Sequence, residues 1–171
     1  MFELNAEMEQ RLAGERRTFW EKSSKSDALA AVRKLVGVRP LAEISPPKMI
    51  EAGRVDRADY HIDKFVLETA SGVPLPGLTY HPQKPGRDAY LYLHDSGKHA
   101  DGAPGGPIEK LVSEGSVVVS IDLRGTGETG VSRSDSLFGD SKTYFMAYLL
   151  GESLVGLHTQ DVLSGAQFVA N

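Results

Sequence analysis

The sequence predicts an α/β fold in which a parallel strand–helix–strand unit follows an antiparallel hairpin. Residues 88–94 and 116–122 are apolar runs, and each is followed by polar, glycine-bearing residues. Between them, residues 107–115 have apolar side chains at helical spacing, as expected of a helix that crosses over between two parallel strands. Both runs are apolar enough to be buried on both faces of a sheet. Because such sheets bind ligands at the carboxyl ends of their strands, we expect function in the loops after His94 and Asp122.

Residues 1–36 are predicted to form two helices in front of this unit. Apolar residues recur every fourth position from Leu4 to Leu12. Ser26 is a suitable N-cap for the second helix, and Gly37 is a suitable end. Acidic and basic residues are mixed along both helices, which favours an extension packed on the domain over a membrane-surface or partner helix.

Residues 41–55 show little periodicity and are predicted to be a connector. The next two strand-like runs, 60–69 and 73–80, flank the turn signal Ser71-Gly72 and therefore predict an antiparallel hairpin. The second run contains prolines, which lack the N–H that a sheet ladder needs. We therefore expect it to be an edge strand.

After Gly130, a long polar loop precedes an apolar helix over 144–150 and a second helix over 152–171. The second helix carries one predicted apolar stripe, formed by Val155, Val162, Ala166 and Val169. The chain stops where the pattern predicts a further strand. We expect two regions: an N-terminal helical extension and connector over 1–58, and the main domain over 59–171.

Composition excludes several classes of function. The chain has 171 residues, a net charge of -4 and a pI near 5.7, which argues against a basic nucleic-acid-binding face. No apolar run approaches the roughly 18 residues of a membrane span, and the acidic first residues do not resemble a signal peptide. The chain has no cysteine, so disulfides and thiolate chemistry are excluded. We expect a cytoplasmic protein that contacts neither nucleic acid nor membrane.

One glycine-rich segment matches the dinucleotide-binding fingerprint G-x-G-x-x-G. It runs from Gly125 to Gly130 after a predicted strand, and Glu152 lies at the right distance for the ribose-binding acid. The residues that follow are polar and offer no apolar helix face, so a structural glycine loop is the preferred interpretation. Dinucleotide binding stays as an alternative. Just before this segment, Asp122 and Arg124 are predicted to form a local ion pair that shapes the turn.

Two further patterns are interpreted as structural. Residues 151–156 are close to the nucleophile elbow G-x-S-x-G, but the second glycine comes one residue late. Ser153 is therefore predicted to be the N-cap of the last helix. Of the five histidines only His94 and His99 are close in sequence, which is weak support for a metal site. We predict no metal site and no cofactor.

Taken together, these features resemble the first half of a serine α/β-hydrolase of the acetylxylan-esterase, dienelactone-hydrolase and glucuronoyl-esterase-like kind. The resemblance covers about residues 60–171. It rests on the order of the elements, on the strand and loop LYLHDSGK that end at Lys98, and on the strand and loop IDLRGTG that end at Gly127. It implies a partial α/β-hydrolase sheet, built from an antiparallel hairpin and a parallel βαβ unit behind the helical extension.

The resemblance also implies roles for particular residues. The backbone N–H of Asp95 or Ser96 falls where the family has an oxyanion-hole donor, although the family usually has His-Gly where this chain has His94-Asp95. The remaining matched positions are implied to form the pocket rim or its structural loops: His94, Asp122, Arg124, Gly125 and Gly127.

The nucleophilic serine, the acid and the histidine of the family follow later elements and do not map onto this chain. In particular, His158 and Asp161 belong to the last helix and cannot replace them. The resemblance thus implies a truncated or incomplete carboxylesterase, acting on esters such as acetylated carbohydrates only when completed. A non-catalytic binding or assembly module derived from a hydrolase is the alternative. Because half a sheet exposes an unpaired edge, we expect self-association or a complementing chain.

Overall fold

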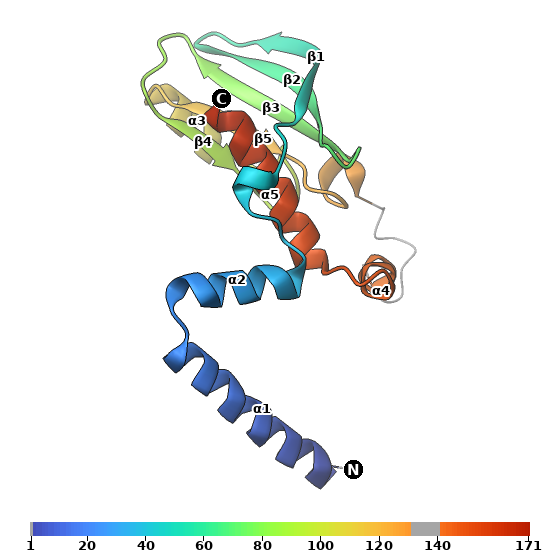
Figure 1. The fold of residues 1–171 in the computed structure, drawn as a ribbon. Helices are drawn as coiled ribbons and strands as arrows, with labels where there is room; N and C mark the ends of the chain where they lie inside the picture. The colour runs from blue at the N-terminus through green and yellow to red at the C-terminus, as the bar shows by residue number, and fades with distance from the viewer. Residues whose placement is uncertain (1, 131–140) are drawn as a thin grey trace.

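The computed structural model describes residues 2–130 and 141–171, which form one five-stranded sheet with helices on both faces (Figure 1). The strands lie side by side in the order β1-β2-β3-β5-β4. They are β1 (Lys48–Asp56), β2 (Tyr60–Glu68), β3 (Pro74–Pro82), β4 (Ala89–Tyr92) and β5 (Val117–Ile121). The helices are α1 (Phe2–Lys22), α2 (Lys25–Val36), α3 (Pro107–Ser113), α4 (Ser141–Leu149) and α5 (Leu154–Ala170), with short 3-10 turns η1 (Leu41–Glu43) and η2 (Gly127–Thr129).

The strand–helix–strand unit and the hairpin are confirmed. β4 and β5 are parallel neighbours, with Ala89 opposite Val117 and Tyr92 opposite Ser120, and α3 connects them. β2 and β3 pair antiparallel around the turn that contains Gly72, which has a positive φ of 75°. β3 then pairs antiparallel with β5 and so joins the hairpin to the parallel unit.

The prediction that β3 is an edge strand is wrong, because β3 lies between β2 and β5. Its prolines are nevertheless compatible with an interior strand. Pairing with β5 is confined to 77–80, whereas Pro74, Pro76 and Pro82 lie outside this stretch. The missing N–H groups therefore fall where β3 has a strand partner on one side only.

The predicted connector over 41–55 is also wrong in its second half, which forms β1 and pairs with β2 along its whole length. Eight of the nine side chains of β1 are exposed and the ninth, that of Val55, is half-buried, so neither face shows the apolar alternation that marks a strand. The ladder with β2 shifts register between Glu51 and Gly53, as at a β-bulge.

β4 is less buried than its apolar sequence predicts. Tyr90 and Leu93 are 44% and 39% exposed. The reason is its position, because β4 is the last strand of the sheet and pairs on one side only among the described residues. An apolar strand at an exposed edge is a ready template for pairing with another chain.

The core lies on the two faces of the sheet. Buried side chains of β2, β3 and β5 pack against Ile108 and Val112 of α3 on one face. On the other face, Phe65, Leu67, Leu75 and Ile121 are covered by Phe168 and Val169 of α5.

The predicted apolar stripe of α5 is only partly correct. Val169 packs on the sheet, but Val155 is 69% exposed. The fully buried positions are the small or polar residues Gly156, Asp161, Ser164 and Gly165. Small residues are needed there because the helix lies close to its neighbours.

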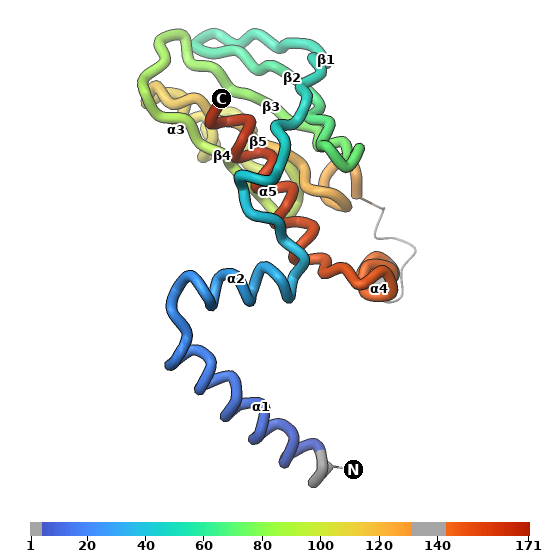
Figure 2. Tube along the Cα trace, viewed as in Figure 1, coloured from blue at the N-terminus to red at the C-terminus, as the bar shows by residue number. Residues whose placement is uncertain are grey.

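The two N-terminal helices differ in how they contact the domain. α2 begins at the N-cap Ser24, not at the predicted Ser26, and ends at Gly37 in the left-handed conformation, as predicted. It packs against α5, whereas α1 extends away from the sheet and places the N-terminus far from the C-terminus (Figure 2). The prediction that this whole extension packs on the domain is therefore wrong for α1, which leaves Met8, Leu12 and Trp20 about half exposed. Over the described residues, no helix has both the length and the apolar character needed to cross a membrane.

Two helical glycines provide a matched test of this arrangement. A Cβ at Gly156 would lie 1.7 Å from the carbonyl oxygen of Val36, whereas a Cβ at Gly14 would meet no atom within 4 Å. We expect Gly156→Ala to weaken the α2–α5 contact and to lower the melting temperature of the domain. Gly14→Ala should stabilise α1 by about 0.5–1 kcal/mol. Circular dichroism at 222 nm during thermal unfolding measures both, and a neutral Gly156→Ala would contradict the close packing.

Candidate functional site

The loops after β4 and β5 meet at the carboxyl ends of the two parallel strands, where ligands of α/β sheets bind. Asp122, which is fully buried, joins them. Its carboxylate accepts hydrogen bonds from the backbone N–H of Lys98 at 2.6 Å, from Nζ of Lys98 at 2.6 Å and from the backbone N–H of Glu128 at 3.0 Å. One side chain therefore fixes both predicted functional loops.

Two glycines allow the backbone to approach this carboxylate. Gly97 and Gly127 both have positive φ, of 97° and 52°. A Cβ on either would lie 2.7 or 2.2 Å from Oδ1 of Asp122. Any larger residue would push the loops off the carboxylate, so glycine is required at both positions.

A single cation, Lys98, is shared by two carboxylates at this point. Lys98 is only 3% exposed, and its Nζ also donates to Glu128 at 2.7 Å. Burial alone would raise the pKa of Asp122, but the hydrogen bonds from Lys98 and from the two backbone N–H groups outweigh burial and lower that pKa below its usual value. The predicted local ion pair between Asp122 and Arg124 is wrong, because the partner of Asp122 is Lys98.

Arg124 instead connects the β5 loop to α5. Its Nε and NH2 groups donate to the two oxygens of the buried Asp161 at 2.8 and 2.5 Å, and its backbone N–H donates to the same carboxylate. Nε2 of His158 lies 2.9 Å from the carbonyl oxygen of Arg124. His158 and Asp161 therefore anchor the loop to the helix.

The geometry of residues 125–130 does not favour dinucleotide binding. The segment forms a turn and the three-residue η2, not the start of a long helix over the described residues. The N–H of Gly125 donates to Thr129 and that of Glu128 donates to Asp122, so neither is free for a pyrophosphate. Glu152 lies between α4 and α5, away from a strand end. The residues after Gly130, up to 140, lie outside the described part of the chain.

The predicted oxyanion donors lie on the loop after β4. The N–H of Ser96 donates to Nδ1 of His94 at 3.0 Å, so in this structure it is occupied. The N–H of Asp95 makes no hydrogen bond to any described residue. The side chain of Asp95 is 92% exposed. Its Oδ1 nevertheless lies 2.9 Å from Nδ1 of His94 and accepts a hydrogen bond from Oγ of Ser96 at 3.2 Å, so a negative charge lies beside the predicted donors.

The serine of the elbow-like segment has a structural role. Ser153 is the N-cap of α5 and accepts from the N–H of Gly156 at 3.3 Å, as predicted. Within residues 2–130 and 141–171, no serine hydroxyl hydrogen-bonds a histidine ring.

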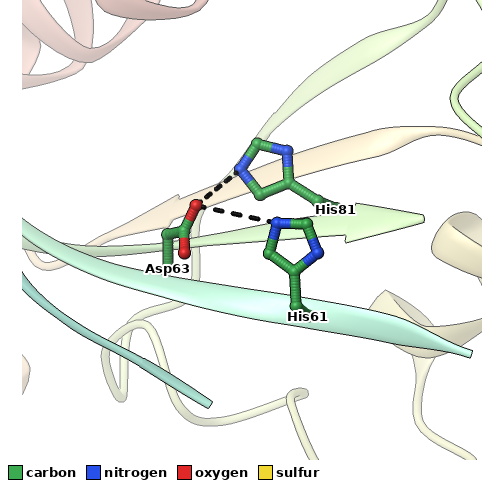
Figure 3. Close-up of side chains that lie close together, drawn as sticks. All are labelled: His61, Asp63 and His81. Atoms are coloured by element: carbon green, nitrogen blue, oxygen red, sulfur yellow. Dashed lines mark ion pairs between the residues drawn. The ribbon is translucent and has the colours of Figure 1, made fainter. Parts of the chain in front are cut away.

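A second cluster, which the sequence interpretation missed, consists of His61, Asp63 and His81 (Figure 3). It lies at the opposite end of the sheet from Asp122. Nε2 of His81 and Nε2 of His61 lie 3.3 and 3.8 Å from the same oxygen of Asp63. These three side chains form the one group in the described residues whose ligand atoms could hold a metal ion. The histidines are 20 residues apart in sequence, and the observed register of β2 and β3 makes them cross-strand partners. The predicted second strand ends at Tyr80, so the sequence does not place His81 in the ladder.

The electrostatics of this cluster are set by its neighbours. Arg54 of β1 donates to both oxygens of Asp63, at 2.6 and 3.1 Å, and chiefly through these hydrogen bonds lowers the pKa of that carboxyl. Burial, assisted by His61, lowers the pKa of His81. Arg54, Asp63 and His81 also line a cavity of about 540 Å³ that extends over the sheet to Phe168 of α5.

Two solved structures are similar to most of this chain. A candidate acetyl xylan esterase from Bacteroides fragilis matches 81% of the chain, with a TM-score of 0.65 and 18% sequence identity. Acetyl xylan esterase 1 from Thermoanaerobacterium sp. matches 84%, with a TM-score of 0.55 and 19% identity. The chain spans 40% and 50% of the lengths of these two proteins. No protein-family model matches the sequence, and no curated protein is similar to it in sequence.

At this level of identity the likeness defines the fold. The order of the elements and the match to both esterases confirm the predicted α/β architecture, a partial α/β-hydrolase sheet of five strands. The roles of the individual site residues stay predictions.

The buried pair of Lys98 and Asp122 gives a test in which the pH dependence of stability has a definite sign. Lys98→Met leaves Asp122 buried without its cation, and we expect a loss of about 3–5 kcal/mol in the free energy of unfolding. Since the folded pKa of Asp122 is lowered, its stabilisation in the parent protein is present above the unfolded pKa near 3.9 and is lost as the pH falls through the folded value. In Lys98→Met the folded pKa should rise instead, so stability should increase as the pH is lowered.

Urea unfolding at several pH values measures this reversal. Glu128→Gln is the matched control, because it removes the other, 59% exposed partner of the same lysine. We expect Glu128→Gln to lower the free energy of unfolding by less than about 1 kcal/mol. Equal losses for the two variants would contradict a central role for Asp122.

Proposed function

We propose that this chain is the N-terminal part of a serine-esterase-type α/β-hydrolase, and that the loops after β4 and β5 form one wall of its active site. The observation that carries the proposal is the joining of these two loops by Asp122 at the carboxyl ends of parallel strands, within a fold shared with two esterase structures. The motifs LYLHDSGK and IDLRGTG, which resemble those of the family, supply these loops.

In the proposed reaction, a serine attacks an ester carbonyl and a histidine accepts the proton of its hydroxyl. Negative charge then develops on the carbonyl oxygen, and preorganised N–H donors stabilise it. The N–H of Asp95 is the first candidate donor. Ser96 can contribute a second N–H once its hydrogen bond to Nδ1 of His94 is exchanged for one to the oxyanion.

The substrate class we propose is a carboxylic ester, with acetylated carbohydrate as the leading candidate. His94, Arg124, Gly125 and Gly127 would shape the rim or support it, and Asp122 would hold the two loops from below. The serine, the base and the acid would come from residues other than those described. The 171 residues alone would therefore be inactive.

The second candidate function is a binding or assembly module, and the exposed apolar surface favours it. β4 is an apolar edge, and α4 exposes large side chains, each at least half exposed: Tyr144, Phe145, Met146, Tyr148 and Leu149. In the esterase proposal, this edge pairs with a strand of the polypeptide that carries the nucleophile. In the alternative, it pairs with a second copy of the chain.

Hydrolysis of p-nitrophenyl acetate separates these proposals. We expect no turnover above buffer by the 171-residue chain, and turnover sensitive to a serine-directed sulfonyl fluoride by the longest polypeptide that its gene encodes. Light scattering on both proteins reports whether the 171-residue chain self-associates and whether the longer polypeptide does not. Sulfonyl-fluoride-sensitive turnover by the 171 residues alone would refute the predicted incompleteness, and a longer product without turnover would favour the assembly module.

The oxyanion assignment is tested by the backbone N–H of Ser96 in the active polypeptide. Ser96→Pro removes this N–H, and Ser96 does not have a positive φ that proline could not adopt. We expect kcat to fall by about 10²–10³. Ser96→Ala keeps the N–H and serves as the control, with kcat near that of the parent. If the two variants have equal kcat, Ser96 is not a donor and Asp95 remains.

A further inference from the structure

We propose that His61, Asp63 and His81 form a binding site for a divalent transition-metal ion of the zinc class. This site is separate from the proposed esterase site. His81 lies beyond Tyr80, which is opposite Val118 near the start of β5, whereas Asp122 follows the end of that strand. The two sites thus occupy opposite ends of the sheet.

The geometry of the three ligand atoms carries the proposal. Both Nε2 atoms face one oxygen of Asp63, at 3.3 and 3.8 Å, and all three atoms lie within 4.8 Å of one another (Figure 3). Ligands about 2.0–2.1 Å from a tetrahedral zinc ion are about 3.3–3.4 Å apart. The distances from the two histidines to Asp63 lie within about 0.5 Å of this spacing, so these atoms can share one ion once the rings adjust.

The backbone holds these side chains in place. His61 and His81 are direct partners in an antiparallel ladder whose register is unbroken from Tyr60–Pro82 to Glu68–Pro74. Their rings are stacked, with centroids 4.7 Å apart and planes at 15°. Because an imidazole binds a metal ion in the plane of its ring, one ring has to turn out of this stack before both Nε2 atoms face the same ion. Asp63 lies two residues after His61 and so on the same face of β2. Ligands on neighbouring strands of a continuous sheet need little ordering when an ion binds.

The donor set selects the type of ion. Two imidazoles and one carboxylate suit zinc and its first-row neighbours, whereas calcium and magnesium prefer oxygen ligands alone. The three side chains are about one-third exposed, at 33%, 35% and 32%. An ion can therefore enter from solvent, and its remaining coordination positions can hold water at the border of the cavity.

Arg54 is the residue that opposes binding. Its guanidinium hydrogen-bonds both oxygens of Asp63, so it orients the carboxylate but also places a positive charge beside the ion. Glu51 and Lys64 line the same cavity and contribute opposite charges. We therefore expect Arg54→Gln, which keeps a hydrogen-bond donor and removes the charge, to bind the metal more tightly than the parent.

The test uses the 171-residue chain without a histidine tag. Zn²⁺ is titrated by calorimetry, and Co²⁺ by its visible absorption, which reports nitrogen and oxygen ligands directly. We expect one ion per chain, an affinity at least about tenfold lower in His81→Asn and in Asp63→Asn, and a higher affinity in Arg54→Gln. His99→Asn, which alters a 65% exposed histidine elsewhere, is the control and should bind like the parent.

The result that would overturn the proposal is the lack of a stoichiometric ion in the parent, or binding that His99→Asn reduces as much as His81→Asn does. Arg54→Gln keeps the test decisive if a histidine variant unfolds, because a gain in affinity by a variant with the circular dichroism spectrum of the parent reports the removed charge. Neither readout depends on ester hydrolysis, so this proposal can fail while the esterase proposal stands, or the reverse.

Discussion

Lys98 and Asp122 lie 24 residues apart and meet inside the protein, where Asp122 is fully buried and Lys98 is only 3% exposed. Taking two charges out of water is costly, and the cost is offset only where both are fully hydrogen-bonded. Here the carboxylate is satisfied by three donors from two loops. The loops that follow β4 and β5 therefore have to adopt their observed conformations together, because moving either loop would leave a buried charge without its partner.

The same requirement explains the two glycines beside the carboxylate. Gly97 and Gly127 leave space for Oδ1 of Asp122 and have the positive φ that bends each loop toward it. In the G-x-G-x-x-G pattern, the middle glycine thus has a steric role toward a carboxylate of the protein. A motif that resembles a phosphate-binding loop here encloses an internal anion.

Much of the fold can be predicted because its main elements are local patterns. The apolar runs, the helix after Pro107 and the turn at Gly72 each depend on neighbouring residues. β1 cannot be found in this way, because its exposed side chains carry no period of two, and its strand character comes from pairing with β2. The prolines of β3 wrongly indicate an edge position, because composition does not reveal which part of a strand is paired on both sides.

The site is predictable only in outline. The strand ends locate the loops after His94 and Asp122, but they do not identify the charge partners. Asp122 pairs with Lys98 and Arg124 pairs with Asp161, and both pairs join residues that are distant in sequence. The nearest basic residue in sequence, Arg124, is the wrong partner for Asp122. The histidine pair likewise depends on the exact register. A two-residue turn at Ser71-Gly72 would pair His61 with Pro82, whereas the observed ladder pairs it with His81.

The ion pair between Arg124 and Asp161 encloses a long excursion of the chain, from the end of β5 to the middle of α5. Both ends of this excursion are fixed to the sheet. Doubling its length would add only about 0.6 kcal/mol of closure entropy. Insertions and deletions between η2 and α5 would therefore be compatible with the packing of α5 on the sheet. Outside these limits, Glu128 contacts Asp122 and Gly156 lies against Val36, so the length is fixed. We therefore expect related proteins to differ in length and sequence in the segment between η2 and α5 while they keep the same fold.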